Sequence, residues 1–508
     1  MSRRGWIVVA PVVALIALGA GLQAAAPPGD DAVSVKRALA DPAVRAAIGP
    51  AGYTAARVSK RDEHNDTVSF FRGQKFAADA IVTDRVRVIK AEAYSPGGVS
   101  TGGSTAGLAW VTLLMLALVI AAIAPARLLS VRMLDAVAVA GIGAGMLLID
   151  RLLLLPGLAL AYAASAWLAA RLFALAWRTS EPDDVPGVFD RLPARYTRYV
   201  LAATVVAALM ITLTSDGLVD VPYASLAGAT ELLEGRLPYG NVVGAFHGDT
   251  YPLLAYAWYL PAAFVHRVHD PFDNIDISLV VSALALVAGA LGIRRAARVC
   301  AAPATGLLIA WFAFPAVLRT AASGMNDVIV AALLAWAIAT ARSPARSGSL
   351  LAAAGWTKVA PVVLLPVWLA RLHGRSLGRA LGAIGAVTAA CLLVLVAYDG
   401  TGGIGAMLDG VSFQLSRSSQ HSLWVLTGLQ SARPAALAGL VCLIGVATWY
   451  AWRHGLEEPR RLAAVSAGLL IVVQLGGAYW SAAYAAWWFP LALVALFARP
   501  SPPPPPSK

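Results

Sequence analysis

The sequence predicts an all-α polytopic membrane protein with a small extracytoplasmic α+β domain near its N-terminus. The composition gives the first reason. Of the 508 residues, 59% are hydrophobic and 13% are charged, whereas a soluble domain is about 45–50% apolar and roughly 25% charged. The mean hydropathy is +0.69. Most of the chain is therefore expected to lie in lipid.

Apolar stretches recur along the chain at the length that a bilayer requires, which is the second reason. A helix needs about 20 apolar residues to cross a hydrocarbon core of roughly 30 Å, and this measure predicts about 13 to 14 transmembrane helices. The count depends on residues 349–371, which are either one span or two half-length helices broken around Lys358 and Pro361. The candidate spans lie near residues 6–25, 106–125, 133–149, 152–176, 198–214, 276–293, 304–319, 326–341, 349–371, 379–397, 434–452, 461–478 and 482–498.

The positive charges favour one orientation for these helices. If 349–371 is counted as two helices, strict alternation places all the basic tracts on one side, which the positive-inside rule makes the cytoplasm. About 22 of the 40 Lys and Arg residues fall there. We expect a multi-pass plasma membrane protein with a cytoplasmic C-terminus, and a cytoplasmic N-terminus unless a signal peptide is cleaved. The tracts are residues 3–4, 127–132, 178–198, 294–298, 342–346, 371–379 and 453–461.

Residues 251–268 are apolar but short, and they contain Pro252 and Pro261. If they crossed the membrane, the basic tract at 294–298 would move to the outside. They are therefore expected to form an amphipathic or re-entrant helix at the outer surface.

The chain divides into five regions by composition. Residues 1–26 resemble a signal peptide or an N-terminal anchor. An extracytoplasmic α+β domain and its Gly/Ser/Thr-rich linker occupy 27–105, with a helix expected at 33–48 and strands at 67–71, 76–82 and 85–94. Additional transmembrane helices and a cytoplasmic loop follow at 106–197, then a transmembrane core at 198–498 and a Pro-rich cytoplasmic tail at 499–508.

Several common functions have no sequence signature here. There is no Walker-type or dinucleotide-binding glycine loop, no H-E-x-x-H and no G-x-S-x-G. The net charge of +12 is accounted for by the orientation signal, so nucleic-acid binding is not expected. Cys300, Cys391 and Cys442 lie in or beside apolar runs, without the spacing of a metal site. No cofactor is expected, and no motif indicates a metal, although a divalent ion is compatible with the chemistry below.

The polar outliers among the apolar segments gather on the predicted outer side. Polar groups at membrane depth are costly and are functional candidates by default. Lys358 has apolar residues on both sides, which makes a snorkelling role the weaker reading. The other candidates have simpler alternatives: a turn for Asp216, a helix cap for Asp220, loop polarity for Arg417 and His421, and an interfacial aromatic belt for residues 479–488.

Several outer segments together resemble the GT-C glycosyltransferases, most closely family 87, which includes polyprenyl-phosphate-mannose-dependent mannosyltransferases of actinobacteria. The resemblance covers roughly residues 198–498 and not 1–197. The chain departs from the family pattern at two points. Where the family usually has a motif close to Y-P-P-L, this chain has Tyr251-Pro252-Leu253-Leu254. The family's aspartate and tyrosine are also often one residue further apart than Asp220 and Tyr223. The matching segments are residues 220–223, 231–239, 251–253 and 356–361, with Asn326 after Gly324 as a weaker element.

The resemblance implies a GT-C-like catalytic core at 198–498 that transfers mannose or another hexose or pentose from a polyprenyl-phosphate donor. The acceptor would be an extracytoplasmic lipid or glycan, and the active site would face outward. One carboxylate suffices for an inverting transfer, with Asp220 as the general base and Asp216 as the alternative. Lys358 would bind the leaving phosphate, helped by Arg417 and His421. The remaining candidate substrate-binding residues are Tyr223, Tyr239, Tyr251, Asn326, Trp480 and Trp488.

Two functions from other classes remain alternatives. A transporter or flippase for a lipid-linked substrate would also be polytopic, but such proteins often contain repeated broken helices, and this sequence has one clear break, at Lys358–Pro361. A non-catalytic assembly protein would use residues 27–105 as a docking module.

Overall fold

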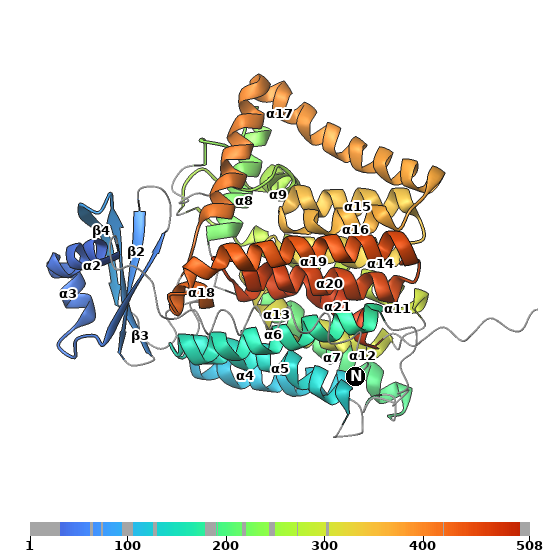
Figure 1. The fold of residues 1–508 in the computed structure, drawn as a ribbon, viewed down its shortest axis with the longest axis horizontal. Helices are drawn as coiled ribbons and strands as arrows, with labels where there is room; N and C mark the ends of the chain where they lie inside the picture. The colour runs from blue at the N-terminus through green and yellow to red at the C-terminus, as the bar shows by residue number, and fades with distance from the viewer. Residues whose placement is uncertain are drawn as a thin grey trace, which may run out of the picture.

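The fold is an α-helical bundle with a small four-stranded sheet at one end (Figure 1), which confirms the predicted class. The predicted span at 6–25, Asp216 and the Pro-rich tail lie outside the residues that can be described. The computed structural model describes residues 31–60, 65–72, 75–93, 105–124, 130–177, 189, 192–215, 220–242, 249–271, 273–300, 304–419 and 421–497.

The small domain contains two short helices, α2 (Asp31–Ala40) and α3 (Pro42–Ile48), and an antiparallel sheet in the order β1-β2-β3-β4. The expected single helix at 33–48 is wrong, because the Asp41 side chain caps α3 and Pro42 starts it. One strand was not predicted, since A-A-R-V-S-K has low β-propensity and is held by pairing with its neighbour. The strands are β1 (Ala55–Lys60), β2 (Asn65–Arg72), β3 (Lys75–Thr83) and β4 (Arg87–Ala93).

The first transmembrane helices are α4 (Thr105–Ile123), α5 (Val131–Asp150), α6 (Leu154–Trp177) and α7 (Ala194–Leu213). Helices α5 and α6 lie unusually close, because a Cβ added to Gly145 would meet the Gly157 carbonyl oxygen at 2.6 Å, and the reverse holds too. Small residues permit this approach between membrane helices. The structure thus explains the glycine-rich run at 141–145.

The second half of the bundle contains long helices together with short and broken ones. Seven described helices are long and apolar enough to cross a membrane, or eight if the pair α12–α13, bent by 55°, is one span. Several of the apolar stretches expected to span fold as shorter or broken helices, and the span expected at 6–25 lies outside the described residues. The helices of this second half are α11 (Ile277–Val299), α12 (Ala304–Ala313), α13 (Pro315–Ala322), α14 (Asp327–Ala339), α15 (Pro344–Thr357), α16 (Leu365–Ala370), α17 (Gly374–Ser416), α19 (Arg433–His454), α20 (Pro459–Gly476) and α21 (Ala485–Phe497).

The expected break in 349–371 is present. Helix α15 ends at Thr357, Lys358 is extended (φ −145°, ψ 141°), and a 3₁₀ turn at Ala360–Leu364 leads into α16. Helix α14 has 13 residues and is therefore about 20 Å long, shorter than a hydrocarbon core of roughly 30 Å. These short helices place the residues at their ends at membrane depth.

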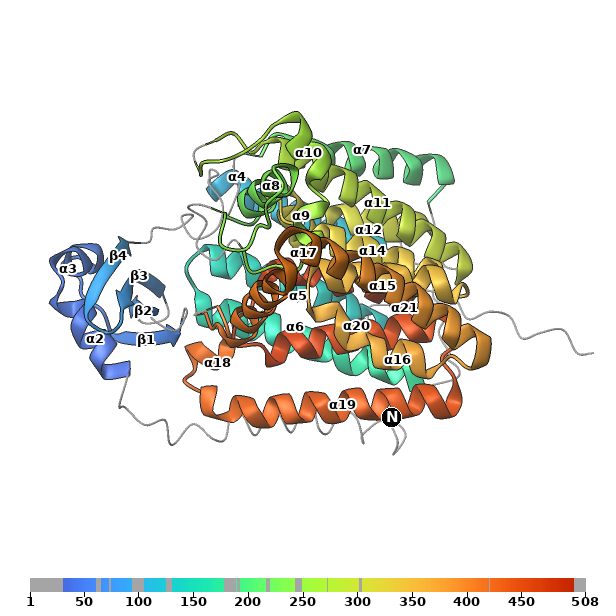
Figure 2. The same cartoon turned by 90° about the horizontal axis from the view of Figure 1, so that it is seen from above.

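Short helices and one half of α17 cover the end of the bundle nearest the sheet (Figures 1 and 2). Helix α17 changes direction at Asp399 and Gly400, which have non-helical angles. In its second half, Gly403 lies against Leu237 and Gly410 against Thr250. The expectation that 251–268 does not span agrees with the two short helices found there. The short helices are α8 (Asp220–Leu233), α9 (Leu254–Ala257), α10 (Leu260–Val265) and α18 (Leu423–Leu426).

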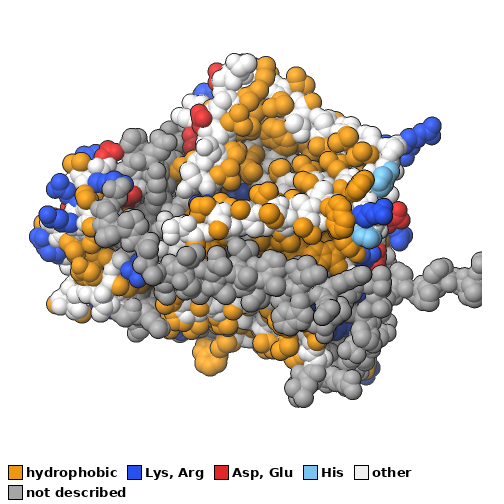
Figure 3. All heavy atoms as spheres, viewed as in Figure 1, with side chains coloured by type: hydrophobic (Ala, Val, Ile, Leu, Met, Phe, Trp, Pro, Cys, Tyr) orange, Lys and Arg blue, Asp and Glu red, His pale blue; other side chains and the backbone are white. Residues whose placement is uncertain are grey.

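Segments in or beside four of the basic tracts predicted to be cytoplasmic meet at the opposite end of the bundle. A cavity of about 500 Å³ there is lined by Cys300, Arg342, Arg371 and Glu457, from four different connections. In Figure 3, Lys, Arg and His side chains gather at this end, far from the small domain. Segments far apart in the sequence thus share this end of the bundle.

Candidate active site

Lys358 is the centre of a buried polar cluster at the break between α15 and α16. Its Nζ lies 3.9 Å from the centroid of the Tyr251 ring and 3.8 Å from Asp327 Oδ2. Its side chain is 11% exposed and that of Asp327 is 2% exposed. The two contacts come from the loop before α9 and from the start of α14, so three distant segments meet at this ammonium group.

Asp327 is held by a second contact. Its Oδ1 accepts a hydrogen bond of 2.9 Å from Trp487 Nε1 of α21. Trp487 in turn stacks on Tyr484, with ring centroids 4.4 Å apart. The carboxylate is thus fixed on both oxygens, and it positions Lys358.

The turn before α14 carries Asn326, whose Nδ2 donates to Ser225 Oγ of α8 at 3.2 Å. Its Oδ1 is buried and has no hydrogen-bond partner among the described residues. Gly324 in the same turn has φ of 69°, a conformation that favours glycine, and its carbonyl accepts from Tyr259 at 3.0 Å. This turn connects α8 with the Asp327–Lys358 pair.

Arg417, at the end of α17, supplies a second cation. Its guanidinium carbon lies 3.8 Å from the Tyr479 ring centroid, and Nη2 donates to Tyr484 Oη at 3.4 Å. Its Nε is buried and lacks a partner in the described part of the chain. The charges of Arg417, Asp327 and Asp220 all act on Lys358, so the four groups belong to one electrostatic cluster.

Tyr251 is one wall of this cluster, and two further tyrosines hold its backbone. Tyr239 Oη donates to the Tyr251 carbonyl at 3.1 Å, and the Tyr251 N–H donates to Tyr256 Oη at 3.1 Å. Tyr239 and Tyr256 meet edge-to-face at 6.1 Å. Tyr239 therefore acts on the site through Tyr251.

Asp220 is the first residue of α8 and is exposed. Its carboxylate makes no hydrogen bond or ion pair with any residue that the structure describes, unlike that of Asp327. Its charge acts on both Lys358 and Tyr251. An exposed carboxylate whose charge acts on a buried lysine is suited to take a proton from a hydroxyl group.

Three other candidates lie elsewhere. His421 and Trp480 line a separate cavity with Asp150 and Arg319. His421 is in the loop between α17 and α18, where burial lowers its pKa to about 4, so it is neutral at neutral pH. Trp488 is fully buried and donates to Gln474 Oε1 at 3.2 Å, which favours a packing role.

Tyr223 is also outside the Lys358 cluster. It is a buried core residue of α8, and the charges that act on it are those of Asp270, Asp273 and Glu231. Its surroundings thus belong to the loop before α11.

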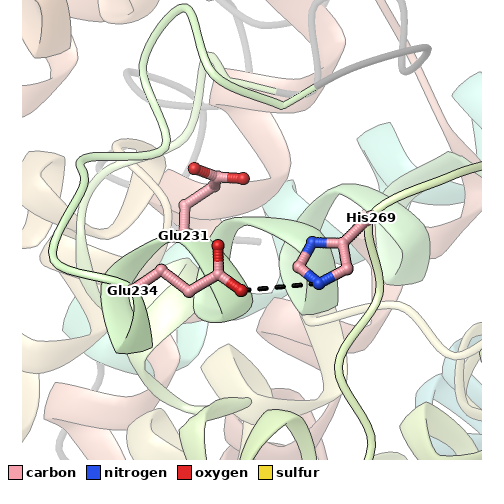
Figure 4. A group of neighbouring side chains, drawn as sticks. All are labelled: Glu231, Glu234 and His269. Atoms are coloured by element: carbon pink, nitrogen blue, oxygen red, sulfur yellow. Dashed lines mark ion pairs between the residues drawn. The ribbon is translucent and has the colours of Figure 1, made fainter.

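Glu231, Glu234 and His269 form an acidic cluster near that loop (Figure 4), with ligand atoms within 4.8 Å of one another. Arginine already occupies the carboxylates: Arg236 reaches Glu231 Oε2 at 2.6 Å and Glu234 Oε2 at 2.7 Å, and Arg267 reaches Glu234 Oε1 at 3.4 Å. Any metal ion would have to displace these ion pairs. We interpret the cluster as a structural one, whose ion pairs hold the end of α8 against the loop before α11.

The comparison with protein families matches part of the chain. Residues 250–476 match the model of glycosyltransferase family 87. This confirms the resemblance seen in the sequence and indicates a glycosyltransferase in a multi-pass membrane protein. The matched range contains Tyr251, Lys358 and Arg417, whereas Asp220 precedes it. Comparisons with curated proteins and with solved structures gave no match.

Sequence reasoning assigned no role to Asp327 or Tyr484, which complete the cluster. The sequence offers an indirect indication of each. Asp327 comes directly after the candidate Asn326, and Tyr484 lies in the aromatic segment 479–488. Their partners, Lys358 and Arg417, are distant in sequence. Only the folded chain brings the pairs together.

Proposed function

We propose that this protein transfers a sugar, mannose or another hexose or pentose, from a polyprenyl-phosphate donor to an extracytoplasmic lipid or glycan acceptor. The acceptor oxygen attacks the anomeric carbon with inversion while Asp220 takes its proton. The bond from that carbon to the phosphate oxygen breaks, and polyprenyl phosphate leaves with the electron pair. Asp216 is the alternative base.

The observation that carries this proposal is a pair of neighbouring cations, the buried Lys358 and the partly buried Arg417. A buried ion costs several kcal/mol unless it is paired. Asp327 is the only carboxylate within 4 Å of Lys358 among the described residues, and Arg417 Nε has no partner there. A bound anionic ligand would give both cations a further negatively charged partner. Cations placed where negative charge develops lower the barrier to the departure of a leaving group.

The position of the cluster suits a lipid-linked donor. Lys358 lies at the ends of helices too short to cross a bilayer, at the end of the bundle opposite the basic tracts. By the positive-inside rule this end is extracytoplasmic. A phosphate carried by a membrane lipid could reach such depth without its chain leaving the bilayer.

The reaction is tested with the full-length protein in nanodiscs and a radiolabelled polyprenyl-phosphate sugar, by following the release of polyprenyl phosphate with a glycolipid extract as acceptor. We expect Asp220→Asn to lower turnover at least ~10²-fold, the usual scale for a general base. Asp409→Asn makes the same chemical change at an exposed position of α17 and should leave turnover unchanged.

Each outcome has a distinct meaning. Full turnover in Asp220→Asn with loss in Asp216→Asn would assign the base to Asp216. Absence of turnover with every carrier-linked sugar, together with movement of the labelled lipid across the bilayer, would replace the enzyme with a flippase.

A further inference from the structure

A second cavity, of about 220 Å³, lies at the sheet end of the bundle beside the Lys358 cluster. Its walls come from the end of α5, from α13 and the turn after it, and from the loops before α18 and α21. The residues that give it chemical character are Asp150, Arg319, His421, Tyr479, Trp480 and Ser481. Nothing in the proposed transfer step uses this cavity.

A planar ion pair forms one wall. Arg319 Nη1 and Nη2 donate to the two oxygens of Asp150 at 2.9 and 2.7 Å. The side chains are 22% and 18% exposed, so both border open space. Because the pair is neutral overall, it suits a ligand with hydroxyl groups better than a phosphate or a carboxylate.

The remaining walls combine uncharged polar groups and aromatic surface. The neutral His421 ring offers one donor and one acceptor nitrogen, with Nδ1 3.3 Å from Ser419 Oγ. Trp480 packs against Tyr162 with ring centroids 6.0 Å apart. A sugar ring has hydroxyl groups at its edge and C–H groups on its faces, so planar polar groups and an aromatic ring are its natural complement.

The cavity shares a wall with the Lys358 cluster. Tyr479 lines the cavity, and the Arg417 guanidinium lies over its ring at 3.8 Å. A glycan bound in the cavity would therefore extend toward the buried cations. This places the cavity where an acceptor would approach.

The wall is supported by the part of the chain that lies outside the family match. Phe71 of β2 belongs to the same buried cluster as Ile149 and Trp480, both of which line the cavity. Arg57 of β1 donates to the Leu426 carbonyl of α18 at 3.1 Å. The small domain thus packs against the outside of this wall.

We propose that this cavity binds one sugar ring of the acceptor, which is therefore a glycan or glycolipid rather than a simple lipid alcohol, and that the small domain stabilises its wall. This inference rests on the proposed glycosyl transfer. It gives residues 27–105 a role in acceptor recognition.

Binding is tested by saturation-transfer NMR on the full-length protein in nanodiscs, with methyl mannosides and methyl arabinosides as probes. We expect one of these glycosides to bind the wild type and to bind about tenfold more weakly to Trp480→Leu, the scale of one aromatic contact. Trp480→Phe should restore most of the binding. Trp452→Leu, at an exposed position of α19, is the matched control.

A second measurement separates this inference from the proposed function. Release of polyprenyl phosphate to water, without acceptor, reports donor cleavage alone. Trp480→Leu should raise the KM for a glycolipid acceptor by a larger factor than it changes donor cleavage, whereas Trp452→Leu should leave both unchanged. Glycoside binding that is sensitive to Trp480 would support the cavity site even if donor cleavage were absent. Binding that is equal in wild type and Trp480→Leu, or absent from the wild type, would overturn the inference.

Discussion

The buried pair of Lys358 and Asp327 affects both the stability of the fold and the charge available to a ligand. The 3.8 Å separation and the additional Tyr251 contact leave Lys358 less tightly paired than a direct ion pair would. Asp327 has a closer partner in Trp487. The arrangement holds the ammonium group in place and leaves part of its charge for a ligand.

Removing one member of this pair should have a different effect from removing both. Lys358→Met leaves a buried carboxylate unpaired, which costs about 3–5 kcal/mol, and removes a cation from the leaving group. We expect a lower melting temperature and at least ~10² lower kcat/KM for the donor. The double variant Lys358→Met with Asp327→Asn should regain stability but not activity.

The measurements are thermal unfolding in detergent and donor-dependent turnover on the same preparations. Asp327→Asn alone serves as the control, because its side chain can still accept from Trp487. Recovery of activity in the double variant would show that the charge of Lys358 is not used in the reaction.

At the residue scale, the sequence predicted the cluster unevenly, for physical reasons. Lys358 was found because a charge between apolar segments is costly. Arg417 gave a weaker signal, since loop arginines are common. His421 and Trp480 were grouped with them by their outward side, but in the fold both line the cavity beside α5 and α13. Their distance from Lys358 could not be read from sequence spacing.

At the scale of elements, hydropathy located most helices and failed where a helix lies across the end of the bundle. The predicted span at 379–397 corresponds to the first half of α17. The second half, after Asp399 and Gly400, contains five polar or charged positions among small and apolar residues and lies outside the predicted spans. Gly400 has φ of 54°, which permits the change of direction that a bulkier residue would oppose.

Packing of this second half can be tested with two glycines of the same helix. A Cβ on Gly410 would lie 2.9 Å from Thr250 Cα, which is backbone and cannot move aside, whereas one on Gly405 meets nothing within 4 Å. We expect Gly410→Ala to lower the melting temperature and the turnover. Gly405→Ala should be neutral or stabilising by about 0.5–1 kcal/mol, because alanine is the better helix former.

Thermal unfolding and turnover of the two variants make the comparison. Equal behaviour of both would mean that the second half of α17 does not rest on the 237–250 loop. In that case it would be free to move during the reaction.

At the scale of the whole molecule, the sequence predicted the polytopic class, because that class follows from the bilayer as solvent. A hydropathy count does not show that α14 to α16 are short helices around a buried site. The role of the small domain could not be predicted, because its contact with the cavity wall depends on Phe71 and Arg57 meeting segments far along the chain.

The orientation of the molecule is the last prediction. Thr401 is exposed in the second half of α17, and Arg375 is exposed at the opposite end, near the start of the same helix. In a cysteine-free background, we expect Thr401→Cys to react with a membrane-impermeant maleimide in intact cells and Arg375→Cys to react only after permeabilisation. The two sites lie on one helix, so a single topology must explain both. The reverse pattern would place the Lys358 cluster at the cytoplasmic face, where a nucleotide sugar, and not a lipid-linked one, would be the natural donor.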